Sequence, residues 1–471
     1  MRASAYSWRV FASNRDRISL AALLVAIAVL VGLHVRDHQA LSHIDELQHM
    51  DYALKSPFHV PRHGDLIGQE AMEEAACRGI DYPLRLSIDA LNDWLHLTGE
   101  RGIETLSPRS IPRVQLPACD AQELTPDQFP NWGLNTASTH PPVYYTTSAL
   151  AAEVIDAVPD VDSNATGVRL AGILWLGAAA VVLWYALGSL GASIWSKALL
   201  IGFLVVAPRV LHESSIINPD TTALLGGALV LAATLRWEAG RAPGWLVPLA
   251  AMVALWLKFT NAFAIGAAVL YLGARAWQQR EVLTSQQLRR WLAVAGSTVI
   301  LTLASVITWT AVQEARGLIP PEQLPTNVIY HVDSFQWNNL GGELFSALTP
   351  LQDQFVPDTL PRDLLEPLGD LLNLLLLAGL GAVAVVSTKR SQFRALAAAA
   401  VAAMVATGVV TMVTSYLSVS VYFDTNPRYG LSLLPIAVAS LVPVLNNRFI
   451  RWVLTAVVLA TAGAVFAGVV S

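Results

Sequence analysis

The chain has 471 residues, of which 54% are hydrophobic and only 14% are charged. A soluble protein of this length carries about a quarter charged residues. The composition, with a mean hydropathy of +0.48, therefore excludes the soluble globular class. It predicts an all-α protein that crosses a membrane several times. The net charge of −5 becomes informative only when it is divided between the two sides of that membrane.

The first apolar segment, 18–35, follows Arg9, Arg15 and Arg17. This is the charge pattern that begins a signal peptide, but no small-x-small cleavage site follows the segment. We therefore expect an uncleaved anchor with its N-terminus in the cytoplasm.

A polar stretch, 41–52, comes next and contains the adjacent acids Asp45 and Glu46. Ionised groups beside a membrane are costly unless they are paired or hydrated. A helix over 45–52 would place Asp45, His49 and Tyr52 on one face, and a carboxylate beside an imidazole suits proton abstraction or metal binding. The alternative is a helix start, in which Ser42 is the N-cap and Asp45 follows three residues later. Both interpretations stay open at this point.

The two cysteines, Cys77 and Cys119, both lie in the long polar segment after the first helix. If that segment is outside the cytoplasm, a disulfide between them is expected. Two free thiols are the alternative. A metal site is disfavoured because the cysteines are far apart and no second pair exists.

Apolar segments predict eleven membrane spans, although two of them, 197–212 and 244–257, are shorter than the ~20 residues that a span usually needs. The predicted spans are 18–35, 166–188, 197–212, 219–235, 244–257, 260–277, 291–311, 367–387, 395–418, 429–446 and 452–470. A further apolar stretch, 143–158, carries Glu153 and Asp156, so we expect a helix lying at the membrane interface.

The basic residues between these spans agree with a cytoplasmic N-terminus, because every predicted inner loop then carries Lys or Arg. The residues on that side are Lys197, Arg236, Arg241, Arg275, Arg280, Arg289, Arg290, Lys389, Arg390, Arg394, Arg448 and Arg451.

The opposite face carries two long loops, 36–165 and 312–366, within one transmembrane domain covering 1–471. Loops this long are functional or disordered, and their tryptophans, other aromatic residues and predicted disulfide favour folded loops. The remaining conspicuous polar groups also fall on this outer face. They are Arg209, His212, Glu213, Asp220, Lys258, His331, Asp333, Asp424, Arg428 and Tyr429. Each has a structural explanation by itself, such as a helix cap or a headgroup anchor, but their convergence suits a catalytic site at the bilayer surface.

The order of these motifs resembles the GT-C superfamily of membrane glycosyltransferases. The likeness is greatest to uncharacterised bacterial membrane proteins allied to the protein-mannosyltransferase and aminoarabinose-transferase types. Ile44-Asp45-Glu46-Leu47-Gln48-His49 is similar to the acidic motif of their first outer loop. Four later segments match in order: Thr139-His140-Pro141-Pro142-Val143-Tyr144-Tyr145, Asn218-Pro219-Asp220, Leu257-Lys258-Phe259-Thr260 and Pro427-Arg428-Tyr429-Gly430-Leu431.

This resemblance implies a GT-C-like hexosyl- or pentosyltransferase in the bacterial plasma membrane. Its donor would be a sugar on a polyprenyl phosphate, and its acceptor a cell-envelope glycan, lipid or protein at the extracytoplasmic face. No nucleic-acid partner is expected. A transporter or lipid flippase is the competing class, and a scaffold protein is the third.

Residue roles follow from this class of reaction. Asp45, or failing it Glu46, is the expected base, with His49 in the same catalytic group. Lys258, Arg428 and Arg209 are expected at the donor phosphate, where cations neutralise charge. Further candidates are His140, His212, Asp220, His331, Asp333 and Tyr429. A divalent cation, Mg²⁺ or Mn²⁺, held by Asp45 and His49 is left open.

Overall fold

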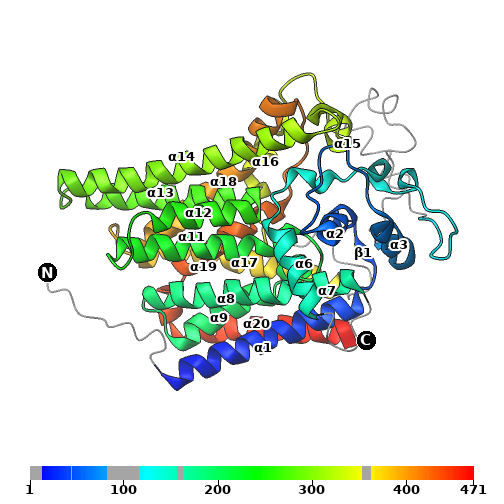
Figure 1. The fold of residues 1–471 in the computed structure, drawn as a ribbon. Coiled ribbons are helices and arrows are strands. Elements are labelled where there is room, and N and C mark those ends of the chain that lie inside the picture. The colour runs from blue at the N-terminus through cyan, green and yellow to red at the C-terminus, as the bar shows by residue number, and fades with distance from the viewer. Residues whose placement is uncertain (1–12, 44, 82–115, 156–162, 353–361, 471) are drawn as a thin grey trace.

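The computed structural model describes residues 13–43, 45–81, 116–155, 163–352 and 362–470. Long helices run side by side in one bundle, and a group of short helices covers one end of it, on the right in Figure 1. This arrangement is the all-α polytopic fold that the composition predicts.

Seven helical stretches in the described residues are long and apolar enough to cross a membrane. The chain is therefore a multi-pass membrane protein. The seven stretches are α1 (Asn14–Asp37), α7 with α8 (Asn164–Leu170 and Gly172–Ser189), η5 with α13 (Phe259–Asn261 and Ala262–Gln279), α14 (Ser285–Arg316), α17 (Arg362–Val386), α18 (Gln392–Val419) and α20 (Arg448–Val470).

The other four predicted spans form shorter helices, so helix length supports seven of the eleven. They contain α9 (Ile194–Val205), α11 (Ala223–Glu238), α12 (Leu246–Leu257) and α19 (Leu434–Ser440). Every residue of α19 is buried, and 3₁₀ turns flank it, η8 (Pro427–Leu433) and η9 (Val444–Asn446). A helix enclosed by other helices does not face lipid, so its length need not match the bilayer and irregular backbone is tolerated beside it.

The described part of the first outer loop is folded around its own apolar core. It contains β1 (Leu41–Ser42), α2 (Glu46–Lys55), α3 (Gln69–Arg78), β2 (Ile80–Asp81), η1 (Pro126–Gln128), η2 (Pro130–Gly133), η3 (Thr136–Thr139) and α6 (Val143–Ile155). The two strands pair in parallel, with Leu41 opposite Ile80. Met50, Tyr52, Met72 and Tyr144 are buried in that core. The predicted loop segments 82–115 and 156–162 lie outside the described residues.

Cys77 and Cys119 are joined in a disulfide, with Cα atoms 4.3 Å apart. The bond ties the last turn of α3 to the segment that leads into η1. α6 has 13 residues, too few to span a bilayer. It packs against α2 and α7, at the end of the bundle where the sequence places an interfacial helix.

The second outer loop is shorter than the predicted 312–366, because α14 continues to Arg316 and α17 begins at Arg362. Its elements are η6 (Pro321–Gln323), α15 (Pro325–Ile329), η7 (Trp337–Asn339) and α16 (Leu340–Ser346). The end of α14 is bound to the first loop. The Gln313 side-chain amide donates to the carbonyl of Ser138 at 2.8 Å, and the Leu318 amide to that of His63 at 2.7 Å.

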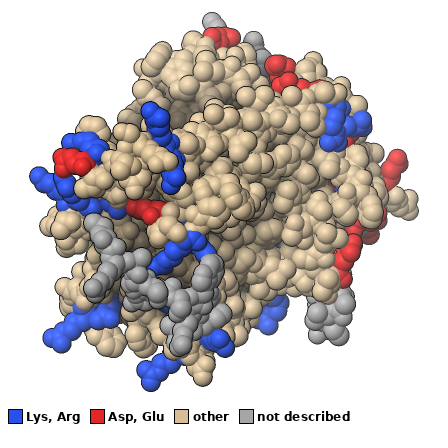
Figure 2. All heavy atoms as spheres, turned by 60° about the vertical axis from the view of Figure 1, so that its left-hand side comes forward, with Lys and Arg blue, Asp and Glu red and all other residues tan. Residues whose placement is uncertain are grey.

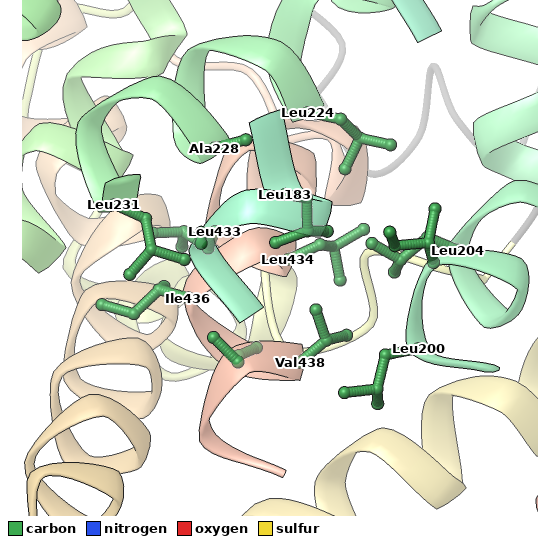
Figure 3. Packing of buried hydrophobic residues seen from close by; sticks show 14 of the residues in the cluster. Leu183, Leu200, Leu204, Leu224, Ala228, Leu231, Leu433, Leu434, Ile436 and Val438 are labelled. Carbon is green, nitrogen blue, oxygen red and sulfur yellow. The ribbon is translucent and has the colours of Figure 1, made fainter. Parts of the chain in front are cut away.

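The centre of the bundle is an apolar cluster in which α8, α11 and α19 meet. Leu183 of α8, Leu231 of α11 and Leu434 of α19 belong to it (Figure 3). Because lipid is as apolar as leucine, close packing rather than water exclusion holds such helices together. Gly227 of α11 illustrates this packing, since a Cβ there would overlap the carbonyl of Ser432 in η8.

The charged side chains divide between the two ends of the bundle. Figure 2 brings forward the end opposite the short helices, where Lys and Arg gather, while most of the Asp and Glu in view lie toward the top and the right edge. This distribution is what a cytoplasmic basic face requires, and the orientation stays a prediction.

Candidate active site at the outer end of the bundle

Three breaks in the helices meet beneath the first outer loop. They are η4 (Pro219–Thr222) before α11, η5 after α12, and η8 after α18. Glycines in α11 permit this approach, because a Cβ on Gly226 would reach Asn261 of η5 and one on Gly227 would reach Ser432 of η8. The result is that Asp220, Lys258 and Arg428, which are distant in sequence, share one site.

Asp220 is the anion at the centre of this cluster. Its carboxylate forms a short ion pair with Lys258, and its Oδ2 lies 3.3 Å from Nε of Arg428. Asn218 fixes the turn, because its side-chain oxygen accepts a hydrogen bond from the Asp220 amide at 2.9 Å. Lys258 is in extended conformation at the C-cap of α12, which ends that helix and directs the chain into η5. The three side chains are buried.

Lys258 and Arg428 share the carboxylate of Asp220, and the carboxylates of Glu213 and Asp45 also act on the charge of Arg428. Nη1 of Arg428 has no hydrogen-bond partner among the residues that the structure describes, although only 9% of the residue is exposed. Tyr429 lies beside both cations, with its ring centroid 5.9 Å from the Lys258 ammonium and 5.9 Å from the Arg428 guanidinium. A buried guanidinium edge without a partner is a binding position for an anion.

Asp45 lies next to this cluster and is accessible to solvent. It precedes α2 in left-handed conformation, with φ of 56°, and its side chain does not cap the helix. The capping interpretation with Ser42 as N-cap is therefore wrong. Burial raises the pKa of the Asp45 carboxyl; the charges of Arg428 and Lys258 oppose this rise and that of Asp220 adds to it. Asp45 is solvent-accessible, and a carboxyl with a raised pKa is a stronger base.

Glu46 occupies a different environment although it is the next residue. Arg169 binds it through two parallel hydrogen bonds of 2.7 Å, from Nε to Oε1 and from Nη2 to Oε2. The backbone amides of Ser42 and Ile217 also donate to it, at 2.6 and 2.8 Å. Burial alone would raise the pKa of Glu46, but Arg169 and these amides hold it below its ordinary value. With its oxygens bound in this way, Glu46 fixes β1 and α2 to α7.

His49 faces the aromatic side of α6. Its Nδ1 lies 2.7 Å from the hydroxyl of Tyr145, and its ring centroid is 5.3 Å from that of His140. Tyr52 stacks on Tyr145 at 3.7 Å. Burial lowers the pKa of His49 well below its ordinary range, and burial together with nearby Lys258 lowers the pKa of His140 to about 3. Both imidazoles are neutral near pH 7 and can donate or accept one hydrogen bond at each nitrogen.

Arg209 and His212 lie deeper than the sequence suggests. Arg209 of α10 (Pro208–Glu213) is fully buried and pairs with Glu213 at 3.2 Å. His212 Nε2 is 3.3 Å from the Ser42 hydroxyl, and its ring packs against that of His34. These residues are buried next to the cluster, and the negative charge of Glu213 favours the charged form of Arg428.

His331 and Asp333 are not part of this cluster. Their side chains are 57% and 84% exposed and lie 3.9 Å apart in the second outer loop. The backbone at His331 forms a bridge with Val421, so this pair marks where the second loop joins the segment after α18.

A divalent cation at Asp45 and His49 would have few protein ligands here. No group of three or more His, Cys, Asp or Glu residues that could hold a metal is found within the described ranges, and Nδ1 of His49 already binds Tyr145. A cation held here would need further ligands from a substrate or water; the divalent cation stays a prediction, and no step below uses one.

Two residues of the site were missed from sequence, Arg169 and the hydroxyl of Tyr145. Arg169 is a lone cation in the otherwise apolar segment 166–188, which is itself a signal for a buried partner. Tyr145 lies inside a quoted motif, but its contact with His49 joins residues 96 positions apart and has no local signature.

No family model and no curated protein matches the chain. Among solved structures, the fold is similar to ArnT from Cupriavidus metallidurans, a crystal structure determined with bound undecaprenyl phosphate. The TM-score is 0.45 and the sequence identity is 16%, over 92% of this chain and 61% of that one. The chain thus spans about three fifths of the length of ArnT.

Proposed function

We propose that this protein transfers a sugar from a polyprenyl-phosphate donor to a hydroxyl group of a cell-envelope glycan, lipid or protein. One observation carries the proposal: an accessible carboxyl, Asp45, lies beside two buried cations, Lys258 and Arg428, at one end of a membrane-embedded bundle. A base next to an anion position is the minimum that such a transfer needs.

Lys258 and Arg428 are the proposed contacts of the donor phosphate. Asp220 holds both side chains in place. A phosphate could accept from Nη1 of Arg428, which has no partner among the described residues. The polyprenyl tail would remain in the membrane between apolar helices, with the phosphate at the bundle end.

The reaction would proceed by attack of the acceptor oxygen on the anomeric carbon of the sugar. The bond between that carbon and the phosphate oxygen breaks, and its electron pair leaves with the lipid phosphate. Lys258 and Arg428 stabilise the negative charge on the leaving group. The acceptor hydroxyl loses its proton to Asp45, whose raised pKa makes it a suitable base.

Glu46 is unsuited to the same task because its oxygens are already bound by Arg169 and by two backbone amides. We assign it a positioning role. It holds the segment that presents Asp45. Neutral His49 and its partner Tyr145 offer hydrogen bonds to a sugar hydroxyl, since such groups suit neutral donors and acceptors.

The test is a transfer assay with the purified full chain in lipid vesicles and a panel of labelled polyprenyl-phosphate hexoses and pentoses. The panel is needed because neither the sugar nor the acceptor is known. Label should move from one donor of the panel to a water-soluble or lipid acceptor present in envelope extract. Asp45→Asn should lower this rate by at least ~10²-fold, the lower limit of general-base catalysis.

Asp120→Asn is the matched control, because it makes the same chemical change at an exposed position of the same outer loop. Its rate should equal that of the wild type. No transfer from any donor of the panel, together with energy-dependent movement of a lipid or solute across the vesicle, would instead establish a transporter.

A further inference from the structure

A second group of carboxylates joins the second outer loop to the segment that follows α18. Glu343 of α16 and Asp424 both contact the hydroxyl of Tyr422, through Oε1 at 3.2 Å and Oδ1 at 2.6 Å. The side chain of Asn339 in η7 donates a hydrogen bond to the same hydroxyl. A tyrosine hydroxyl has one proton, so it can donate to only one of the two carboxylates at a time.

Glu343 is buried, and the protein supplies partners for only one of its two carboxylate oxygens. The residue is 3% exposed, and its Oε1 also accepts from the backbone amide of Thr425 at 3.3 Å. Its Oε2 is buried and has no hydrogen-bond partner among the described residues. Buried charges in proteins are paired or bound to a metal ion, so a cation is expected at this oxygen.

Neither of the two segments contains a basic side chain that could be this cation. Residues 317–352 include three acidic residues but no Lys or Arg, and residues 420–426 include Asp424 but no Lys or Arg. Arg428, the next basic residue in the sequence, pairs with Asp220 instead. Two carboxylates that share one hydroxyl repel each other unless a cation lies between them. A metal ion from solution can fill that place.

We propose that Glu343 and Asp424 bind one calcium ion, which joins the second outer loop to the segment before η8. Ca²⁺ takes roughly six to eight oxygen ligands and accepts irregular arrangements of carboxylate, amide and water oxygens. Oε2 of Glu343, the carboxylate of Asp424 and the amide oxygen of Asn339 are ligands of this kind. Asp424 is exposed, so water can complete the shell. Mg²⁺ is less suitable, because it requires near-ideal octahedral geometry and releases water reluctantly.

Thermal unfolding of the full chain in detergent, after metal ions are removed with EDTA and at constant ionic strength, tests this site. CaCl₂ should raise the Tm of the wild type in a saturable way, because an ion that binds only the folded state stabilises it. The rise should be half-maximal at about 0.1–1 mM, the affinity range of extracellular calcium modules. MgCl₂ should require higher concentrations for the same rise.

Asp424→Asn distinguishes a metal ligand from a residue that only stabilises the fold. It should weaken the apparent affinity for Ca²⁺ at least ~10-fold, the smaller of the losses seen when groups around a bound metal are changed. Without Ca²⁺, its Tm should equal or exceed that of the wild type, because the variant removes the repulsion with Glu343. Asp333→Asn is the matched control, since it makes the same change at a side chain that is 84% exposed in the second outer loop. It should keep the wild-type response.

Three results would overturn the calcium site. The first is a wild-type Tm that does not respond to Ca²⁺. The second is an equal Ca²⁺ response in Asp424→Asn and Asp333→Asn, which would show only general attraction to an acidic surface. The third is a wild-type response to Mg²⁺ at lower concentrations than to Ca²⁺.

Discussion

Two groups of charged side chains lie at the same end of the bundle. They differ in how many of their hydrogen-bonding atoms have a partner in the protein. In one, Glu46 and Arg169 exchange two hydrogen bonds, and neighbouring backbone groups take up the remaining capacity of both side chains. In the other, Asp220 serves two cations, Nη1 of Arg428 lacks a described partner, and Asp45 stays accessible. We call the first group saturated, because its hydrogen-bonding atoms have protein partners, and the second unsaturated. Saturated charged groups stabilise the fold, whereas unsaturated ones can bind a substrate. The contrast is the reason we propose a stabilising role for the first group and a catalytic role for the second.

The largest effect is expected from breaking the saturated group. Arg169→Ala leaves Glu46 buried without its partner and should cost about 3–5 kcal/mol of stability, seen as a lower Tm in detergent. Arg390→Ala is the control, because its pair with Glu281 is largely exposed and contributes less than about 1 kcal/mol. Equal Tm values for both variants would mean that the buried pair contributes no more to stability than the exposed pair.

Removing a cation from the unsaturated group should weaken substrate binding in the molecules that remain folded, in which Arg428 still pairs with Asp220. Lys258→Ala deletes one charge-assisted contact to the donor phosphate, a contact of about 1.5–3 kcal/mol. KM for the donor should rise by roughly tenfold or more, while kcat changes less. Lys389→Ala, at an exposed position between α17 and α18, should leave KM unchanged. A loss confined to kcat would place Lys258 outside the phosphate contact.

The close approach that assembles the unsaturated group can be tested at Gly227. Gly227→Ala introduces a Cβ that overlaps the carbonyl of Ser432, and such overpacking costs about 1–3 kcal/mol. The variant should lower Tm and transfer together, because η8 carries Arg428. Gly266→Ala has open space around its Cβ and should be neutral or slightly stabilising. If both variants behave alike, packing at Gly227 does not hold the cluster.

Acid pH should separate the two adjacent carboxylates, because their pKa shifts have opposite signs. The pKa of Asp45 is raised by burial, so its base form is lost first and transfer falls as the pH drops through that value. The pKa of Glu46 is lowered in the folded protein, chiefly by Arg169 against the effect of burial. Its stabilisation is present above its unfolded pKa and disappears only as the pH falls through the lower folded value. A profile of kcat/KM and Tm against pH should therefore lose activity before stability; loss of Tm first would reverse the assignment.

The sequence predicted the class of fold, the disulfide and several residues that the structure brings together, but not the different environments of Asp45 and Glu46. Hydrophobic segments and basic loops depend on local composition, so the helices could be placed from it. Four predicted spans are longer than the helices they correspond to. The length of an apolar segment does not show whether other helices enclose it, as they do α19. Asp45 and Glu46 could not be separated, because what distinguishes them is Arg169, 123 residues beyond Glu46, and a left-handed turn at Asp45.

His331 and Asp333 were predicted as site residues but lie away from the cluster. They have suitable chemistry and lie on the predicted outer face, yet they are exposed on the second loop. Topology places residues on a side of the membrane, whereas a site also depends on which breaks between helices come together. Here the glycines of α11 decide that, through contacts with η5 and η8.

The most direct test compares Asp45→Asn with Glu46→Gln, measuring Tm and the transfer rate per folded molecule for each. Asp45→Asn should keep the wild-type Tm and lose at least ~10²-fold in rate. Glu46→Gln should lower Tm, while the molecules that remain folded transfer within a few-fold of the wild-type rate. The opposite pattern, with Asp45→Asn active and folded Glu46→Gln inactive, would contradict the account and make Glu46 the base.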